Sequence, residues 1–138
     1  MTGLRFTSAN DAPERDPTSF VLSGSNDGQT FEVVSQGAIP EFTGRFVTVD
    51  VPVEGAAPYL QYSVRFPPIR DAGAAGAMQI AEVELVGLVG GGPAGPIADV
   101  TEPGDFVEAT SSNSPWNEGV VNAIDNNPST KYLNFDEL

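Results

Sequence analysis

Short apolar runs separated by glycine and proline constrain the fold of this chain more than any other feature. The 138 residues include 15 Gly and 12 Pro, and no segment carries ten residues with a convincing helical period. Hydrophobic and polar residues instead alternate over strand-length runs, which is typical of half-buried β-strands. The length fits one domain with its own core. The sequence therefore predicts a single all-β domain.

The strands and their buried faces follow from the alternation. Strands are expected over 3–8, 20–22, 31–34, 44–53, 59–69, 77–88 and 129–135. Between the second and third, Asn26-Asp27-Gly28 predicts a hairpin turn, since glycine accepts a positive φ. One further set is expected to be buried in the core: Leu60, Tyr62, Val64, Phe66, Phe6, Phe20, Phe31 and Phe46.

Charge and composition exclude several functions. The net charge of −13 repels phosphate backbones, so nucleic acid is not expected as a partner. Cysteine and histidine are absent, which removes disulfides and the commonest general base. No apolar run is long enough for membrane insertion. Catalysis would have to rely on carboxylate pairs, and no spacing singles one out, so the chain is not expected to be an enzyme.

Two charged sets are expected to lie at the surface. The acids Asp11, Glu14 and Asp16 are interpreted as a solvated loop. The arginines are expected to be too dispersed for an anion site and to pair with surplus carboxylates: Arg5, Arg45, Arg65 and Arg70.

The chain divides into a body, a linker and a second block. Residues 1–88 form the β-rich body, and 89–96, "VGGGPAGP", have the composition of a linker. Residues 97–138 are too few for a core of their own. This block is expected to pack against the body or against a neighbouring chain.

Three motifs together resemble the discoidin, or coagulation-factor type C, family of galactose-binding-like jelly rolls, whose fold is shared by family 32 carbohydrate-binding modules. They are "NAIDNNPSTKY" (122–132), "FVLSGSNDGQTFEVV" (20–34) and "IAEVELVG" (80–87). The resemblance implies an antiparallel β-sandwich jelly roll. In the family the first motif opens the domain and the third closes it, so this chain is in permuted order. It is either a circular permutant or a slice across two tandem repeats, and about one strand of the family fold has no counterpart.

A calcium site is predicted at the first motif. The Asp125 carboxylate, the Asn122 and Asn127 carbonyls and the Thr130 hydroxyl supply the oxygen ligands that Ca²⁺ prefers, and Glu82 would complete the set. The resemblance implies a structural calcium at this place, although Asn126 replaces the usual glycine. The alternative is that Asp125 caps a turn and Thr130 begins a strand.

A carbohydrate site is predicted around the single tryptophan. Trp116 lies in a polar loop between Asn113 and Asn117, and an exposed tryptophan usually marks recognition. Arg15 would contribute if its loop lies nearby. The alternative is that Trp116 closes the end of the barrel. The histidine common in sugar sites of the resembled family is absent.

Two functions remain open. The first is a non-catalytic extracellular or cell-surface module that binds carbohydrate and is stabilised by calcium. The second is a structural repeat of an adhesin, filament or surface layer, in which copies assemble by exchanging a strand at an open sheet edge. Since one fold carries many functions, the resemblance does not choose between them.

Overall fold

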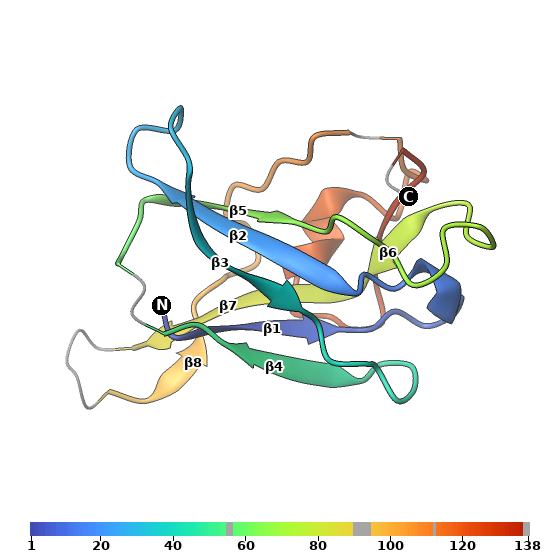
Figure 1. Ribbon diagram of the computed structural model, residues 1–138, viewed down its shortest axis with the longest axis horizontal. Helices are drawn as coiled ribbons and strands as arrows, with labels where there is room; N and C mark the ends of the chain where they lie inside the picture. Colours follow the sequence, from blue (N-terminus) through green and yellow to red (C-terminus); the bar gives the residue numbers. More distant parts are fainter. Residues whose placement is uncertain (55–56, 90–94, 112, 137–138) are drawn as a thin grey trace.

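The computed structural model of the chain describes residues 1–54, 57–89, 95–111 and 113–136, and these residues form an all-β structure with hardly any helix (Figure 1). Two short 3₁₀ turns are present, η1 (Pro13–Arg15) and η2 (Val120–Ile124). The strands are β1 (Gly3–Thr7), β2 (Ser19–Ser25), β3 (Glu32–Ala38), β4 (Thr48–Pro52), β5 (Gln61–Arg65), β6 (Met78–Ile80), β7 (Glu82–Leu88), β8 (Ile97–Asp99) and β9 (Tyr132–Asn134).

All strand pairs are antiparallel, and the described strands form three sheets. Their orders are β4-β1-β7-β8, β3-β2-β5 and β6-β9. The first two sheets lie over one another as two layers (Figure 1), an arrangement consistent with the expected β-sandwich. The jelly-roll topology and the permuted order stay predictions.

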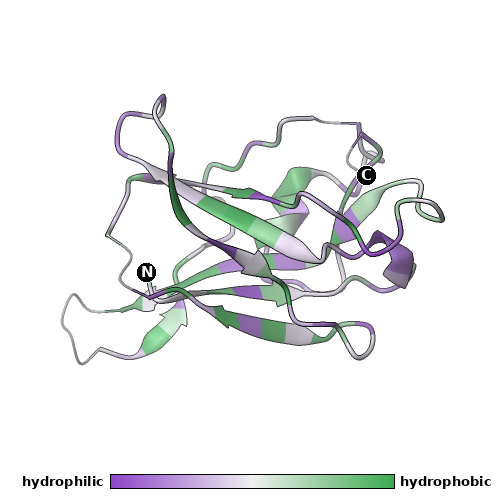
Figure 2. Ribbon diagram, in the orientation of Figure 1, coloured by the Kyte–Doolittle hydropathy of each residue, from purple (hydrophilic) through white to green (hydrophobic). Residues whose placement is uncertain are grey.

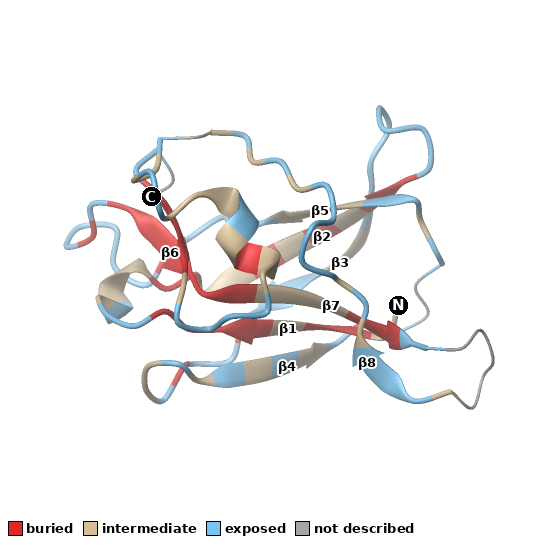
Figure 3. Cartoon of the chain, turned by 180° about the vertical axis from the view of Figure 1, so that it is seen from behind, coloured by how far each residue is buried: buried red, intermediate tan, exposed pale blue. Residues whose placement is uncertain are grey.

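The core lies between the layers and is built by the alternation in the sequence. Along β1, Leu4 and Phe6 are buried, and along β2, Phe20 and Leu22 are buried (Figure 3). Figure 2 shows the matching alternation of hydrophobic and hydrophilic residues along β1 and β4. The Phe6 ring packs against Phe20 and Phe66, with centroids 5.8 Å apart in each pair. The period-2 pattern therefore predicted this layer correctly.

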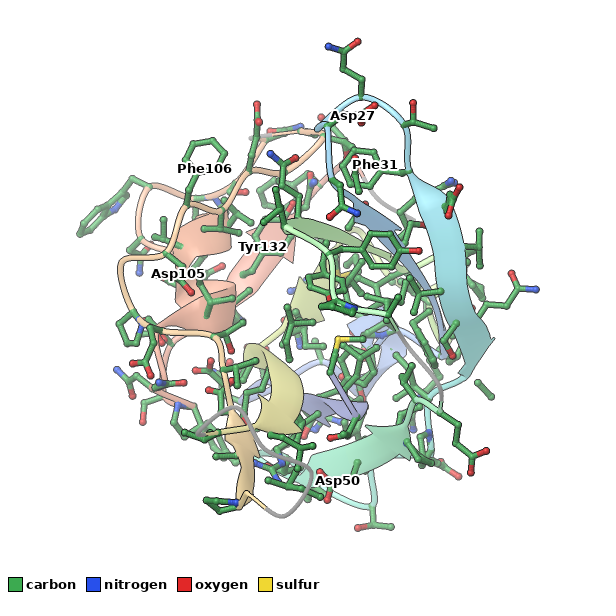
Figure 4. All side chains as sticks on the ribbon, turned by 90° about the vertical axis from the view of Figure 1, so that its left-hand side faces the viewer. Asp27, Phe31, Asp50, Asp105, Phe106 and Tyr132 are labelled. Carbon is green, nitrogen blue, oxygen red and sulfur yellow. The ribbon has the colours of Figure 1, made fainter. Side chains whose placement is uncertain are left out.

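Three residues expected in the core are exposed, and each has a local reason. Phe31 lies at the tip of the β2–β3 hairpin, just before β3 begins (Figure 4). Phe46 has a φ of +58°, which turns it out of the alternation before β4. Leu60 precedes the first paired residue of β5 and is 81% exposed. The interpretation of these residues as core was wrong, because alternation orients side chains only inside a paired strand.

The C-terminal block packs on the body of the same chain. Strand β9 pairs with β6, placing Tyr132 opposite Ile80, and η2 packs against β7. Strand β8 pairs with β7, and the Val89 N–H donates to the Pro96 carbonyl at 2.9 Å. Most of the predicted linker, 90–94, lies outside the described residues. The division into body, linker and second block stays a prediction. No helix among the described residues has the length and hydropathy needed to span a bilayer.

Candidate functional site

Strand pairing brings the 125–130 loop against Glu82. Strand β9 pairs with β6, and Glu82 follows the end of β6 by two residues, so the loop that leads into β9 passes beside the Glu82 side chain. The Asn127 N–H donates to Glu82 Oε1 at 2.8 Å and to Asp125 Oδ1 at 2.9 Å. Residues 45 positions apart are thereby joined at one point.

Oxygen atoms converge within this loop. Thr130 Oγ1 lies 3.0 Å and 2.8 Å from the two carboxylate oxygens of Asp125 and 2.7 Å from the Asn127 carbonyl oxygen. A threonine hydroxyl has a single proton, so it can donate to one of these acceptors at a time. The result is a compact set of carboxylate, hydroxyl and carbonyl oxygens, which is the ligand chemistry of calcium.

Glu82 is the most perturbed group of the site. It is only 3% exposed, and its Oε2 has no hydrogen-bond partner among the described residues. Burial, and next the charge of Asp125, raise the pKa of the Glu82 carboxyl to about 7. A buried carboxylate beside a second carboxylate is costly unless a cation or a proton neutralises it. A divalent cation or a shared proton would each relieve this cost.

Asn126 stands where the resembled motif has glycine, yet it adopts a backbone conformation that glycine favours. Its φ is +57°, in the left-handed region that glycine occupies most easily. Asparagine is the residue that best tolerates this region after glycine. The backbone therefore takes the conformation expected for glycine at this position.

Asn122, the fifth predicted calcium ligand, was expected to bind through its backbone carbonyl, and that stays a prediction. Its side chain holds the loop in place. Its Nδ2 donates to the Asn117 carbonyl at 2.8 Å and to the Lys131 carbonyl at 3.0 Å. In the described part of the chain, no group of three or more His, Cys, Asp or Glu side chains is close enough to hold a metal. Asp125 and Glu82 supply only two carboxylates, so the remaining calcium ligands would be the Thr130 hydroxyl and carbonyl oxygens. The calcium assignment stays a prediction.

The Trp116 side chain is 96% exposed, so of the two interpretations of this residue the structure favours the exposed one. The loop that carries it is anchored to the segment around β9 at both ends. The Phe135 N–H donates to the Asn113 carbonyl and the Leu133 N–H to the Glu118 carbonyl, each at 3.0 Å. An exposed indole is thus presented from a loop whose ends are fixed. Its role in ligand binding stays a prediction.

The other predicted ligand residues have different surroundings. Asn113 Nδ2 donates to Asp136 Oδ1 at 2.6 Å, and Asn117 accepts the Asn122 hydrogen bond through its backbone carbonyl. Arg15 ends η1, and its Nε is buried without a partner among the described residues. In that part of the chain no hydrogen bond or ion pair joins Arg15 to the Trp116 loop.

Lys131 nevertheless links the Trp116 loop to the loop between β1 and β2, which carries Asp11, Glu14 and Asp16. Its Nζ lies 2.9 Å from Asp11 Oδ1, 3.1 Å from Gln79 Oε1 and 4.0 Å from Glu118 Oε1. The sequence does not predict that this lysine is buried, because nothing in "STKYLNF" indicates that its only basic residue points inward.

The interpretation of the Asp11, Glu14 and Asp16 loop as solvated is wrong for Asp16. Asp16 is only 1% exposed and binds the guanidinium groups of Arg45 and Arg70. The arginines, expected to be dispersed, converge here in part, since positions 16, 45 and 70 meet only in the folded chain. Arg5 pairs with Asp50 and Glu84, as expected for surplus carboxylates.

Comparison with known proteins gives one informative similarity. No family model matches the chain. The chain is similar to a peptide-N(4)-(N-acetyl-beta-glucosaminyl)asparagine amidase of Arabidopsis thaliana, with 35% identity over 89 residues. The match covers 62% of this chain but only 12% of that much longer protein.

Proposed function

We propose that this chain is a non-catalytic carbohydrate-binding module of the jelly-roll type, acting outside the cell or at its surface and stabilised by calcium. The observation that carries the proposal is the exposed Trp116 on its anchored loop. Support also comes from the similarity to part of a protein whose name states that it acts on N-acetylglucosaminyl-asparagine.

The Trp116 loop supplies what recognition of a neutral sugar requires. An indole offers a rigid apolar face of large area at low entropic cost. Polar groups lie on either side of it, in Asn113, Asn117 and Glu118. Fixing both ends of the loop lowers the entropy lost on binding, because the backbone is ordered before the ligand arrives.

Calcium would act as a structural cation rather than a reactant. It would bind Asp125, Glu82, Thr130 and the Asn127 carbonyl, joining the β9 segment to β7. The unpartnered Glu82 oxygen and the raised pKa of its carboxyl support this part of the proposal. The loop shaped by such a cation leads directly into β9, on which the Trp116 loop is anchored.

The test is isothermal titration calorimetry with N-acetylglucosamine and its β1,4-linked disaccharide, chosen from the chemistry in the relative's name. Trp116→Ala should abolish the heat of binding. Leu60→Ala is the control, because it also removes a highly exposed apolar side chain but lies near β5. Absence of binding by the unaltered protein, across these two and a wider panel of neutral glycans, would refute the proposal.

A structural repeat that assembles with copies of itself is the second candidate. Among the described strands, six have a neighbour on one side only, which favours pairing with another chain: β3, β4, β5, β6, β8 and β9. Light scattering over a range of concentrations, in buffer with calcium, tests it. A mass that rises with concentration and is unchanged in Trp116→Ala would favour assembly over glycan binding.

A further inference from the structure

An open groove of about 620 Å³ lies beside η1, and neither the predicted calcium ligands nor the residues of the Trp116 loop line it. Asp11 from the first loop, Glu41 and Arg45 from the β3–β4 connection, and Arg70 from the β5–β6 connection line it. Three separate loops thus meet at one concave surface.

The two arginines are fixed from behind by one buried carboxylate. Arg45 donates through both terminal nitrogens to the Asp16 carboxylate, and its Nη1 also donates to the Asp11 carbonyl at 3.1 Å. Arg70 Nη2 lies 3.4 Å from Asp16 Oδ2, and its Nη1 donates to Glu41 Oε1 at 3.2 Å. Guanidinium groups held this way lose little further rotamer entropy when a ligand binds.

Acceptors line the groove beside these donors. The Glu41 side chain is 79% exposed at its rim. Asp11 remains ionised, since its hydrogen bond from Lys131 lowers the pKa of the Asp11 carboxyl. The three carboxylates Asp11, Asp16 and Glu41 are balanced by Lys131, Arg45 and Arg70, so the groove carries no excess positive charge, on a chain of net charge −13. This balance disfavours anions and suits hydroxyl groups, each of which donates and accepts.

The backbone around the groove is strained. In the described residues three non-glycine residues have a positive φ, and two belong here: Ala12 (φ 46°) lines the groove, and Phe46 (φ 58°) follows Arg45. Such conformations persist only where the surroundings impose them, and they cluster at ligand sites. Phe46 is also half-exposed and directly follows Arg45 in the chain, just outside the residues that line the groove.

We propose that this groove is a second sugar subsite, so that the ligand is a neutral oligosaccharide rather than a single sugar. The inference rests on the proposed function and extends it. Asp11 and Glu41 accept hydrogen bonds from sugar hydroxyls, Arg45 and Arg70 donate them, and Phe46 contacts the apolar face of the ring. Lys131, which contacts both Asp11 and Glu118, connects the groove to the loop that carries Trp116.

The test compares the monosaccharide N-acetylglucosamine with a chitin tetrasaccharide as probes, by calorimetry on the full chain. Glu41→Ala and Phe46→Gly are the variants, because the first side chain is exposed and glycine accepts the positive φ of the second. Glu41→Ala is expected to weaken tetrasaccharide binding about tenfold, the scale of one hydrogen bond to a charged group. Phe46→Gly is expected to weaken it by a similar factor, because it removes an apolar contact. Monosaccharide binding should stay unchanged. Glu54→Ala, an exposed acid elsewhere, is the control.

Each outcome supports or overturns one assignment. If Trp116→Ala abolishes binding but neither groove variant affects the tetrasaccharide, the subsite is refuted and the proposed function stands. If the groove variants weaken binding and Trp116→Ala does not, the groove is supported and the Trp116 assignment fails. If the unaltered protein binds neither probe nor any longer neutral glycan, both proposals are overturned.

Discussion

Replacing Glu82 with glutamine should stabilise the metal-free protein and abolish its response to calcium. Burial and the neighbouring Asp125 raise the Glu82 pKa from 4.5 to about 7. Each pKa unit corresponds to about 1.4 kcal/mol, so ionising this group in the folded state costs up to about 3 kcal/mol. Relaxation of the surroundings reduces such costs, and about 1–3 kcal/mol is expected. Glutamine keeps the acceptor for the Asn127 N–H and carries no charge.

The pH dependence follows from the direction of the shift. The folded state binds this proton more tightly than the unfolded chain, which favours folding at acid pH. The metal-free protein should therefore lose stability as pH rises from about 4.5 to about 7, and level off above. Glu82→Gln should lack this loss. At pH 8 in EDTA its melting temperature should exceed that of the unaltered protein by at least about 3 °C.

Calcium should cancel or reverse the difference in stability between the two proteins. At a hundredfold excess over its dissociation constant, a ligand of the folded state adds about 2.7 kcal/mol. The unaltered protein should gain this stability, and Glu82→Gln should gain little. Thermal unfolding by circular dichroism, in EDTA and in millimolar calcium, measures both effects. Glu84→Gln is the matched control on the same strand: it loses the ion pair with Arg5 but should keep the calcium response.

A melting temperature of Glu82→Gln below that of the unaltered protein, in EDTA at pH 8, would refute the argument that the ionised Glu82 carboxylate destabilises the fold. An equal calcium response in both proteins would refute the calcium site. The two results are independent, so each part of the reasoning is tested separately.

Three further substitutions test the packing by urea denaturation. Asp16→Asn should lower the free energy of unfolding by about 3 kcal/mol, because Asp16 is a buried carboxylate that pairs with two arginines. Glu14→Gln removes the same charge and should leave the free energy of unfolding nearly unchanged. Leu22→Ala should lower the free energy of unfolding by about 2–5 kcal/mol, because Leu22 is buried, and Leu60→Ala by less than about 0.5 kcal/mol, because Leu60 is exposed. Similar losses for the two variants would contradict this difference in burial. Gly28→Ala should cost about 1 kcal/mol, since its φ is +71°, and no loss would mean the turn adopts another conformation.

Local patterns in the sequence predicted the β-strands well. The strand over 3–8, the hairpin around Gly28 and the turn leading into β9 all depend on neighbouring residues, and the structure contains each of them. Alternation also predicted correctly that Phe6 and Phe20 are buried inside paired strands. It misplaced Phe31, Phe46 and Leu60, because all three lie where pairing stops and the backbone is free to turn.

The candidate site was predicted only in part, for a similar reason. The short spacing of Asp125, Asn127 and Thr130 placed their oxygens together, since a tight loop brings such residues within hydrogen-bond distance. Glu82 was added through the resemblance to a known family, and the pairing of β9 with β6 does place it beside the loop.

The sequence by itself determined the all-β class, the turns, the acidic surface and the polar loop that carries Trp116, but it left open whether that side chain is exposed. Only the tertiary structure decided that Asp16 is buried between Arg45 and Arg70 and that Lys131 joins Asp11 to Glu118. The physical reason is the range of the interactions. Backbone preferences and alternation act over a few residues, whereas these charges meet across dozens of positions and pair only once the strands have taken their register.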